Sequence, residues 1–390
     1  MQIENTLSMN FAGLLNNTNT LILLSIMALA FVGLMLYYGL FYLRVALWKD
    51  KKTVSGDQSD AHFLPPVSVV LAACNESFYL KESLYVLLDQ DYPEFEVVVV
   101  DYVSKDDTPF VLQMCKENFP DRMKIIPMKE DVNFFLGKKF PLTLGIRSAK
   151  YDHIILTEPD TLPQNRDWIR SMMAGYTGGT AIVMGYNGIL QEKGVLNRLQ
   201  QYDHMNQISH CFGRAMMGRP YTALNRNISF RKQFFFDKGA FTHHYTEPHG
   251  AADLFVNENA SKTNTRIMLN KDSIVQAVPR TTASQWREQR RAYFAPKRYY
   301  GWMDKLRLAW RWILLLLLYS AIAVFLVFNI NSWIIPGAVV LMLWIWQIIT
   351  FSRLCKRFEV KRIALLAPLY EIYFLFPNTI LMLLALFKKK

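Results

Sequence analysis

Four long apolar stretches limit what this chain can fold into more than any other feature of its 390 residues. They cover residues 21–43, 313–330, 333–351 and 363–387, and the first three contain no charged side chain. About 20 consecutive apolar residues are enough to cross the hydrocarbon core of a bilayer as a helix. Residues 65–280, between the first two stretches, contain charged residues, glycine and proline at globular frequencies. We therefore expect a globular domain inserted between membrane spans.

The charges beside these stretches predict on which side of the membrane the globular domain lies. Only Glu4 is charged before the first stretch, whereas residues 44–52 are rich in lysine and arginine. Cytoplasmic flanks are enriched in these residues, so we expect a retained anchor and a cytoplasmic domain in a multi-pass protein of the inner (cytoplasmic) membrane. The last stretch is interrupted by Pro368, Glu371 and Pro377, which allows either a full crossing or a kinked, re-entrant segment.

The net charge of +12 is explained by the membrane rather than by nucleic acid. The basic residues cluster beside the apolar stretches, where they would meet anionic lipid head groups. No basic groove with interleaved aromatic residues accompanies them, so we expect membrane lipids and no nucleic acid among the partners. The four cysteines lack C-x-x-C spacing and fall on the predicted cytoplasmic side, which predicts reduced thiols.

Short apolar runs alternate with helical patterns through the first half of the globular region. The runs predict strands at 67–73, 96–101, 124–128 and 153–157, separated by helices at 80–88, 109–118 and 140–149. Strands that are apolar throughout are typical of a mostly parallel sheet covered on both faces, so the predicted fold class is α/β. The less regular second half predicts helices at 167–176 and 197–217 and strands at 181–186 and 225–230. Residues 285–311, rich in Arg, Lys, Trp and Tyr, predict a helix lying in the membrane interface.

These patterns divide the chain into five predicted parts. They are an N-terminal tail (1–20), a transmembrane anchor (21–47), the cytoplasmic domain (65–280), an interfacial amphipathic segment (281–311) and the C-terminal transmembrane segments (312–387).

Acidic side chains stand where two of the predicted strands end. Asp101 ends the run VVVVD, and Glu158 and Asp160 follow IILT. Ligands of open α/β sheets bind beyond the carboxyl ends of the strands. Two acids one residue apart can hold Mg²⁺ or Mn²⁺ against a sugar diphosphate, although the same triplet is also common in a solvated turn. Lys138 and Lys139 open a helix, which suits either a phosphate or plain solvation of the helix end.

Several motifs share an order with a known family. They are VSVVLAACNE, QDYPEFEVVVVDYVSKDDT, GKKFPLTLGI, ILTEPDTLP, NRNISFRK, GAADLFVNENASKTNT and WREQRRAYFAPKRYY, and they extend from about residue 67 to residue 300. With them the chain resembles the membrane-bound, inverting family 2 glycosyltransferases, which have the GT-A nucleotide-sugar-binding fold. The resemblance implies one N-terminal and about three C-terminal transmembrane helices around that domain.

The resemblance also implies roles for individual residues. Glu158 and Asp160 match the Asp-x-Asp motif that binds the metal, Asp160 and Asp253 are the predicted catalytic residues, and Asp253 matches the last acid of an acidic loop. The predicted nucleotide-sugar-binding residues are Asn75, Glu76, Asp101, Lys138, Lys139, Glu158, Gln289, Arg290 and Arg291. Among them, Lys139 and Arg291 come from their positions beside Lys138 and Arg290.

The acidic loop departs from the family pattern at the position that matters most. Relatives have an aspartate there as the general base, and this chain has Ala251, with Ala252 replacing a further acid. A general base accelerates transfer by ~10²- to 10⁴-fold. Asp253, Glu247 and His249 are the nearest side chains that could replace it. In the interfacial Gln-x-x-Arg-Trp element, Ala292-Tyr293 stands for Arg-Trp, and Arg290 or Arg291 could compensate.

Two functions of different class follow from these observations. The first is a probable hexosyl-type glycosyltransferase, which moves a sugar from a nucleotide-sugar donor to a lipid-linked or polysaccharide acceptor at the cytoplasmic membrane face. The second is a catalytically impaired partner or scaffold subunit, which would act with other glycan-assembly proteins. A polymerase that also exports its product is ranked below both, because four spans are few for an unaided pore.

Overall fold

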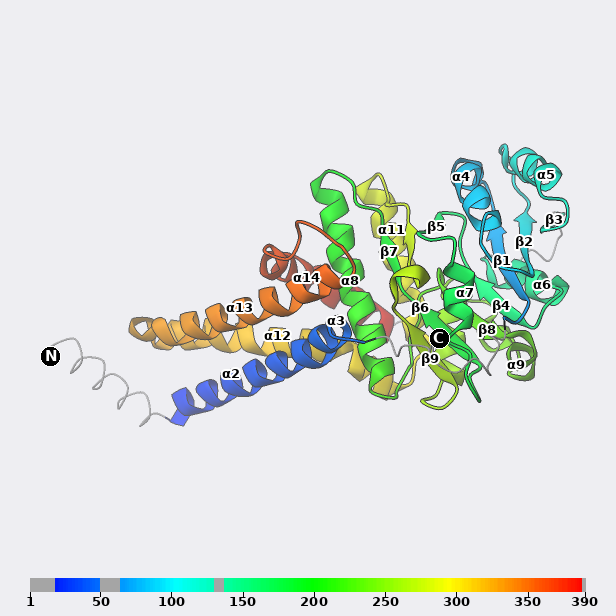
Figure 1. Ribbon diagram of the computed structural model, residues 1–390. Coiled ribbons are helices and arrows are strands. Elements are labelled where there is room, and N and C mark those ends of the chain that lie inside the picture. The colour runs from blue at the N-terminus through cyan, green and yellow to red at the C-terminus, as the bar shows by residue number, and fades with distance from the viewer. Residues whose placement is uncertain (1–17, 50–63, 130–136, 388–390) are drawn as a thin grey trace. The chain divides into compact units, whose positions relative to one another are not determined.

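The computed structural model describes residues 18–49, 64–129 and 137–387, which form two compact units (Figure 1). The sheet unit is Trp48–Tyr300, and the helical unit combines the segment up to Leu47 with the segment from Gly301 onward. Each unit is described by itself below.

The sheet unit is built on a seven-stranded sheet with the order β3-β2-β1-β4-β8-β6-β9. The pairs β1–β2, β2–β3, β1–β4 and β6–β9 are parallel, and β8 pairs antiparallel with both β4 and β6. The strands are β1 (Val67–Ala73), β2 (Phe95–Tyr102), β3 (Met123–Met128), β4 (His153–Leu156), β6 (Ile182–Gly185), β8 (Ile228–Arg231) and β9 (Thr265–Met268). This mostly parallel α/β sheet confirms the predicted fold class.

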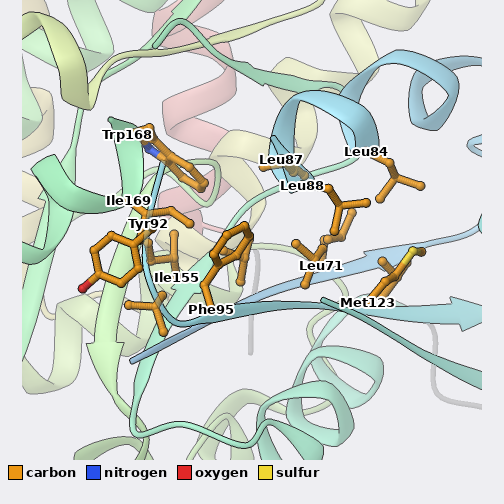
Figure 2. Close-up of a cluster of buried hydrophobic side chains, with 14 of the residues drawn as sticks. Leu71, Leu84, Leu87, Leu88, Tyr92, Phe95, Met123, Ile155, Trp168 and Ile169 are labelled. Carbon is orange, nitrogen blue, oxygen red and sulfur yellow. The ribbon is translucent and has the colours of Figure 1, made fainter. Parts of the chain in front are cut away.

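Helices cover both faces of the parallel half of the sheet. The helices of the unit are α4 (Ser77–Leu88), α5 (Thr108–Asn118), α6 (Lys139–Ser148), α7 (Trp168–Met173), α8 (Val195–Met216), α9 (Lys232–Asp237), α10 (Ala251–Asn259) and α11 (Ala283–Phe294). Odd-numbered residues of β1 and β2 pack with α4, α5 and α7 in one apolar cluster, part of which Figure 2 shows around Leu71 and Phe95. The even-numbered Val70 and Val100 face α6 at Gly145. The absence of a side chain at Gly145 lets α6 approach this face closely.

Short segments complete the sheet unit. A second sheet has the order β5-β10-β7, made from β5 (Thr161–Pro163), β7 (Asn187–Ile189) and β10 (Val275–Ala277). The 3₁₀ helices are η2 (Thr242–His244), η3 (Lys271–Ser273) and η4 (Ala295–Tyr299). The strands of the second sheet were not predicted from the sequence, because strands of three residues carry no periodic signal.

The helical unit contains four helices long and apolar enough to cross a membrane, which cover Thr18–Ala46, Trp302–Phe328, Ile330–Arg357 and Ala367–Leu384. Their elements are α2 (Thr18–Tyr37), a π-helix η1 (Tyr38–Leu43), α3 (Arg44–Ala46), α12 (Trp302–Phe328), η5 (Ile330–Ser332), α13 (Ile334–Arg357) and α14 (Ala367–Phe387). Apolar side chains face outward on this unit, for example Leu29 and Val327, which are 75% and 77% exposed. Such exposure suits contact with lipid, and the predicted long apolar helices, one N-terminal and three C-terminal, are confirmed.

A buried polar cluster joins three of these helices. The Tyr38 hydroxyl donates to both carboxylate oxygens of Glu371 at 2.5 and 2.6 Å. Arg311 donates to the Tyr42 hydroxyl at 2.7 Å and lies 3.4 Å from the Glu371 carboxylate. Glu371 therefore faces other helices of this unit. Helix α14 continues through Pro377, and the side to which it leads stays a prediction.

Two predicted segments differ from the structure. The predicted helix over 285–311 is interrupted, because α11 ends at Phe294, Pro296 lies in a 3₁₀ turn, and α12 begins only at Trp302. The predicted acidic loop at 250–255 is the start of α10 instead. Gly250 takes a left-handed conformation with φ 69°, which turns the chain into the helix. All four cysteines are free thiols, as predicted.

Candidate active site

A cavity of about 550 Å³ opens in the sheet unit beyond the carboxyl ends of β1 and β4. Ala72 and Leu156 form its floor at the strand ends, and residues of α8, α10 and α11 form other parts of the wall. Ligands of parallel α/β sheets bind at this edge, and the volume is typical of a small-molecule site. The Thr157 hydroxyl is buried beside this cavity and has no hydrogen-bond partner among the described residues.

The two acids of the Glu-Pro-Asp triplet are neutralised by arginines from distant segments. Arg226 makes a bidentate pair with Asp160, with Nε 3.1 Å from Oδ1 and Nη2 2.8 Å from Oδ2. Its Nη2 also lies 3.2 Å from Glu158, and Nη2 of Arg280 donates to Oδ2 of Asp160 at 2.9 Å. Burial would raise the pKa of Asp160, but the two guanidinium groups hold it below its usual range. The carboxylate is therefore ionised, and each of its oxygens accepts at least one hydrogen bond from a guanidinium group.

This arrangement does not fit the predicted Mg²⁺ or Mn²⁺ site. A divalent cation needs lone pairs on carboxylate oxygens, and both oxygens of Asp160 already accept hydrogen bonds from guanidinium groups. Over residues 18–49, 64–129 and 137–387, no three His, Cys, Asp or Glu side chains gather as they would around a metal ion. The sequence prediction missed this because the arginines lie 66 and 120 positions after Asp160.

The remaining strand-end residues lie at the same edge of the sheet. Glu76 forms an ion pair with Lys138 at 3.7 Å, and the negative charges of Asp160 and Glu158 repel its carboxylate. Burial raises the pKa of Glu76, while Lys138 acts in the opposite direction. Asp101 is buried at the end of β2 and accepts a hydrogen bond from the Ser104 amide at 3.3 Å. Lys138 and Glu158 line the cavity.

Two predicted nucleotide-binding residues have their polar groups engaged elsewhere. Asn75 is in a left-handed conformation with φ 55°, and its side chain accepts from the Lys105 amide at 2.7 Å, which holds the loop after β2. Lys139 is buried and donates to the His244 carbonyl at 2.7 Å, and it is not part of the cavity wall. Burial lowers the pKa of Lys139 to about 8. Of the predicted lysine pair, only Lys138 therefore reaches the site.

Asp253 is the centre of a buried hydrogen-bond network. Its carboxylate accepts from Lys297 at 2.6 Å, from the Tyr300 hydroxyl at 2.6 Å, from the Thr222 hydroxyl at 2.8 Å and from the Ala223 amide at 3.1 Å. Asp253 and Lys297 are 4% and 2% exposed. Burial lowers the pKa of Lys297, and Asp253 counteracts that change. A carboxylate with four donors is poorly placed to take a proton from a substrate, so this geometry disfavours the predicted catalytic role of Asp253.

Next to the alanine pair, the cavity wall includes the titratable residue His249. Ala251 and Ala252 are buried at the start of α10 and line the cavity. Glu247 is buried and paired with Arg298 at 2.8 Å. The His249 side chain is exposed at the cavity wall, and its ring has no partner among the described residues.

Helix α11 contributes further residues to the cavity wall. A capping box between Thr282 and Gln285 fixes its start. Gln289 and Arg290 line the cavity, and Arg290 is buried and pairs with Asp203 at 2.9 Å. Arg291 is exposed and lies outside the wall. The helix therefore brings Gln289 and Arg290, but not Arg291, to the site.

Comparison with known proteins identifies a family for part of the sheet unit. The family described as "Glycosyl transferase family 2" matches residues 68–243. Residues 68–243 belong to glycosyltransferase family 2. The resemblance of the strand-end motifs to this family is therefore confirmed, and the chain also has four apolar helices of membrane-spanning length among its described residues.

Curated relatives match parts of the chain. A poly-β-1,6-N-acetyl-D-glucosamine synthase of Staphylococcus aureus is 24% identical over 185 residues, which are 47% of this chain and 42% of the relative. The corresponding synthase of Staphylococcus epidermidis is 29% identical over 96 residues, or 25% of this chain and 22% of the relative. The chain thus spans less than half the length of these relatives, and the polysaccharide in their names is the product of those proteins.

A solved structure with a similar fold covers more of the chain. A mannosyltransferase from Pyrobaculum calidifontis, in complex with GDP-Man and Mn²⁺, covers 90% of this chain and 97% of its own, with a TM-score of 0.58 and 20% identity. At that identity the likeness establishes the GT-A fold alone. The GDP-Man and Mn²⁺ belong to that complex.

Proposed function

We propose that this family 2 protein transfers a sugar, of hexosyl type, from a nucleotide-sugar donor to a lipid-linked or polysaccharide acceptor at the cytoplasmic face of the membrane. One observation carries the proposal. The cavity at the carboxyl ends of the parallel strands is lined by Lys138, Arg226 and Arg280, whose cationic groups suit a diphosphate. The basic residues after the first apolar helix support the cytoplasmic side.

The acceptor is proposed from the helical unit. A chain with four helices of membrane-spanning length is held where lipid-linked substrates are, which favours an acceptor carried by lipid or growing at the membrane. The relatives named as polysaccharide synthases agree with this class of acceptor. Other glycan-assembly proteins are proposed as partners on the same ground.

His249 is the side chain that we propose as the general base. It lines the cavity beside Ala251, whereas Asp253 and Glu247 are paired with the cations Lys297 and Arg298. Its imidazole would take the proton of the acceptor hydroxyl as that oxygen attacks the anomeric carbon. The bond from that carbon to the diphosphate oxygen breaks, and the nucleoside diphosphate leaves.

The test is turnover by the purified full chain in detergent or lipid. A panel of nucleotide sugars is first screened by thermal shift, because a donor at 100 times its Kd stabilises the protein by ~2.7 kcal/mol. Release of nucleoside diphosphate is then followed with membrane-lipid and glycan acceptors. H249Q should slow turnover by ~10²- to 10⁴-fold while donor binding is kept. The exposed His243, paired with Glu258, provides the matched control H243Q.

A second candidate function is a partner or scaffold subunit that binds the donor without transfer. It is favoured by the alanine at position 251 and by the engagement of Asp253 with Lys297. A251D separates the two functions. If the chain transfers sugar only after this substitution, it is an impaired transferase. Turnover by the unmodified chain would exclude the scaffold role as its sole function.

A further inference from the structure

The arginines at the donor site sit in the place where the family pattern calls for a metal ion. Arg226 comes from the turn before β8, and Arg280 follows β10. Both converge on Asp160, whose side chain is 5% exposed, while those of Arg226 and Arg280 are 15% and 24% exposed. Both arginines line the cavity, and Asp160 is not part of its wall. The Asp160 carboxylate therefore binds the two guanidinium groups from outside the cavity wall.

The charges of this cluster are already balanced. Glu158 and Asp160 supply two negative charges, and Arg226 and Arg280 supply two positive charges. Binding a divalent cation to Asp160 would require its bidentate pair with Arg226 to open. That would leave a nearly buried guanidinium beside a newly bound cation, which is unfavourable in a low-dielectric site. The geometry thus favours the arginines over a metal at this carboxylate.

The arginines keep donors for a ligand. Arg280 uses Nη2 on Asp160, and among the described residues no acceptor contacts its Nε or Nη1. Arg226 contacts the two acids through Nε and Nη2, so among the described residues its Nη1 also has no acceptor. A guanidinium fork matches phosphate oxygens and forms charge-assisted hydrogen bonds. The unpartnered Thr157 hydroxyl beside the same cavity adds one more group that a polar ligand would satisfy.

We propose that Arg226 and Arg280 take the place of the divalent cation, so that the diphosphate of the donor binds to guanidinium groups and donor binding needs no metal. This proposal rests on the proposed function, since it concerns the same donor. It assigns Asp160 a positioning role, in which the carboxylate orients the two arginines.

The test measures binding of UDP and GDP to the full chain by calorimetry, once with EDTA and once with Mn²⁺. We expect the affinity of the nucleotide that binds to differ by less than about threefold between the two conditions. R280Q should weaken binding by at least about tenfold in EDTA, because it removes a charged hydrogen-bond donor to phosphate. R280K should recover only part of the loss, since it keeps the charge but not the fork.

The control is R166Q, because Arg166 makes an exposed pair with Asp89 and is not part of the cavity wall. Each variant is checked for an unchanged melting temperature without nucleotide, and D160N supplies a second route to the same loss if R280Q is unstable. Binding that appears only with Mn²⁺ would overturn the inference and leave the proposed function standing. Binding of neither nucleotide in either condition, nor of any nucleotide sugar in the thermal screen, would overturn both.

Discussion

Replacing Asp253 by asparagine tests whether this residue holds the fold together or takes part in catalysis. The substitution removes the charge that compensates Lys297, which is 2% exposed. Removing one partner of a buried ion pair costs ~3–5 kcal/mol, because the other charge stays buried without compensation. A domain of the size of the sheet unit loses ~2–4 °C of Tm per kcal/mol, so D253N should lower its Tm by about 6 to 20 °C.

The assay is thermal unfolding of the full chain followed by intrinsic fluorescence, with D121N as the control because Asp121 is exposed. The double variant D253N/K297M should melt above D253N, since it no longer buries a lone cation. A Tm for D253N within 2 °C of that for D121N would refute the reasoning. If turnover were lost at that unchanged Tm, Asp253 would be a catalytic group after all.

Three further predictions concern other parts of the chain. A methyl group at Gly145 would meet side chains of β1 and β2 at 2.7 and 2.9 Å, so G145A should destabilise by ~1–3 kcal/mol in denaturant unfolding, whereas G179A, at an open position, should not. E371Q should destabilise the helical unit by leaving Arg311 uncompensated, and E371Q/R311Q should melt higher than E371Q, as measured by a thermal assay in detergent. Because burial lowers the pKa of Lys139 to about 8 from 10.5, the folded state binds fewer protons than the unfolded state between these values. Stability should therefore rise with pH across that window relative to K139M, and equal Tm changes from pH 8 to pH 10 would contradict this.

The parallel half of the fold was predictable because its local signals agree. The runs 67–73 and 96–101 are apolar throughout, as strands buried on both faces must be, and β1 and β2 coincide with them to within a residue. The apolar helices were equally clear, since length and lack of charge suffice to define them. The strand at β8 was predicted, but its antiparallel pairing and the three-residue strands depend on tertiary contacts, which the sequence does not display.

The candidate site was only partly predictable for a related reason. The strand ends located Asp101, Glu158 and Asp160 at one edge, because parallel strands bring their carboxyl ends together. The identity of their partners depends on chain segments that return to this edge much later. Arg226 lies within the motif NRNISFRK, and a charged residue inside the predicted strand 225–230 was a signal of an ionic partner. Arg280 lies outside these motifs, and its contact with Asp160 is known only from the structure.

The polar cluster in the helical unit has a consequence for biosynthesis. Tyr38 and its acceptor Glu371 are 333 residues apart, yet they meet inside the same bundle. A ribosome makes the first apolar helix long before the last, so the Tyr38 hydroxyl gains this acceptor only after 333 further residues have been translated. Helices α12 and α13 are made in that interval, and the polar cluster is complete only once α14 has been made.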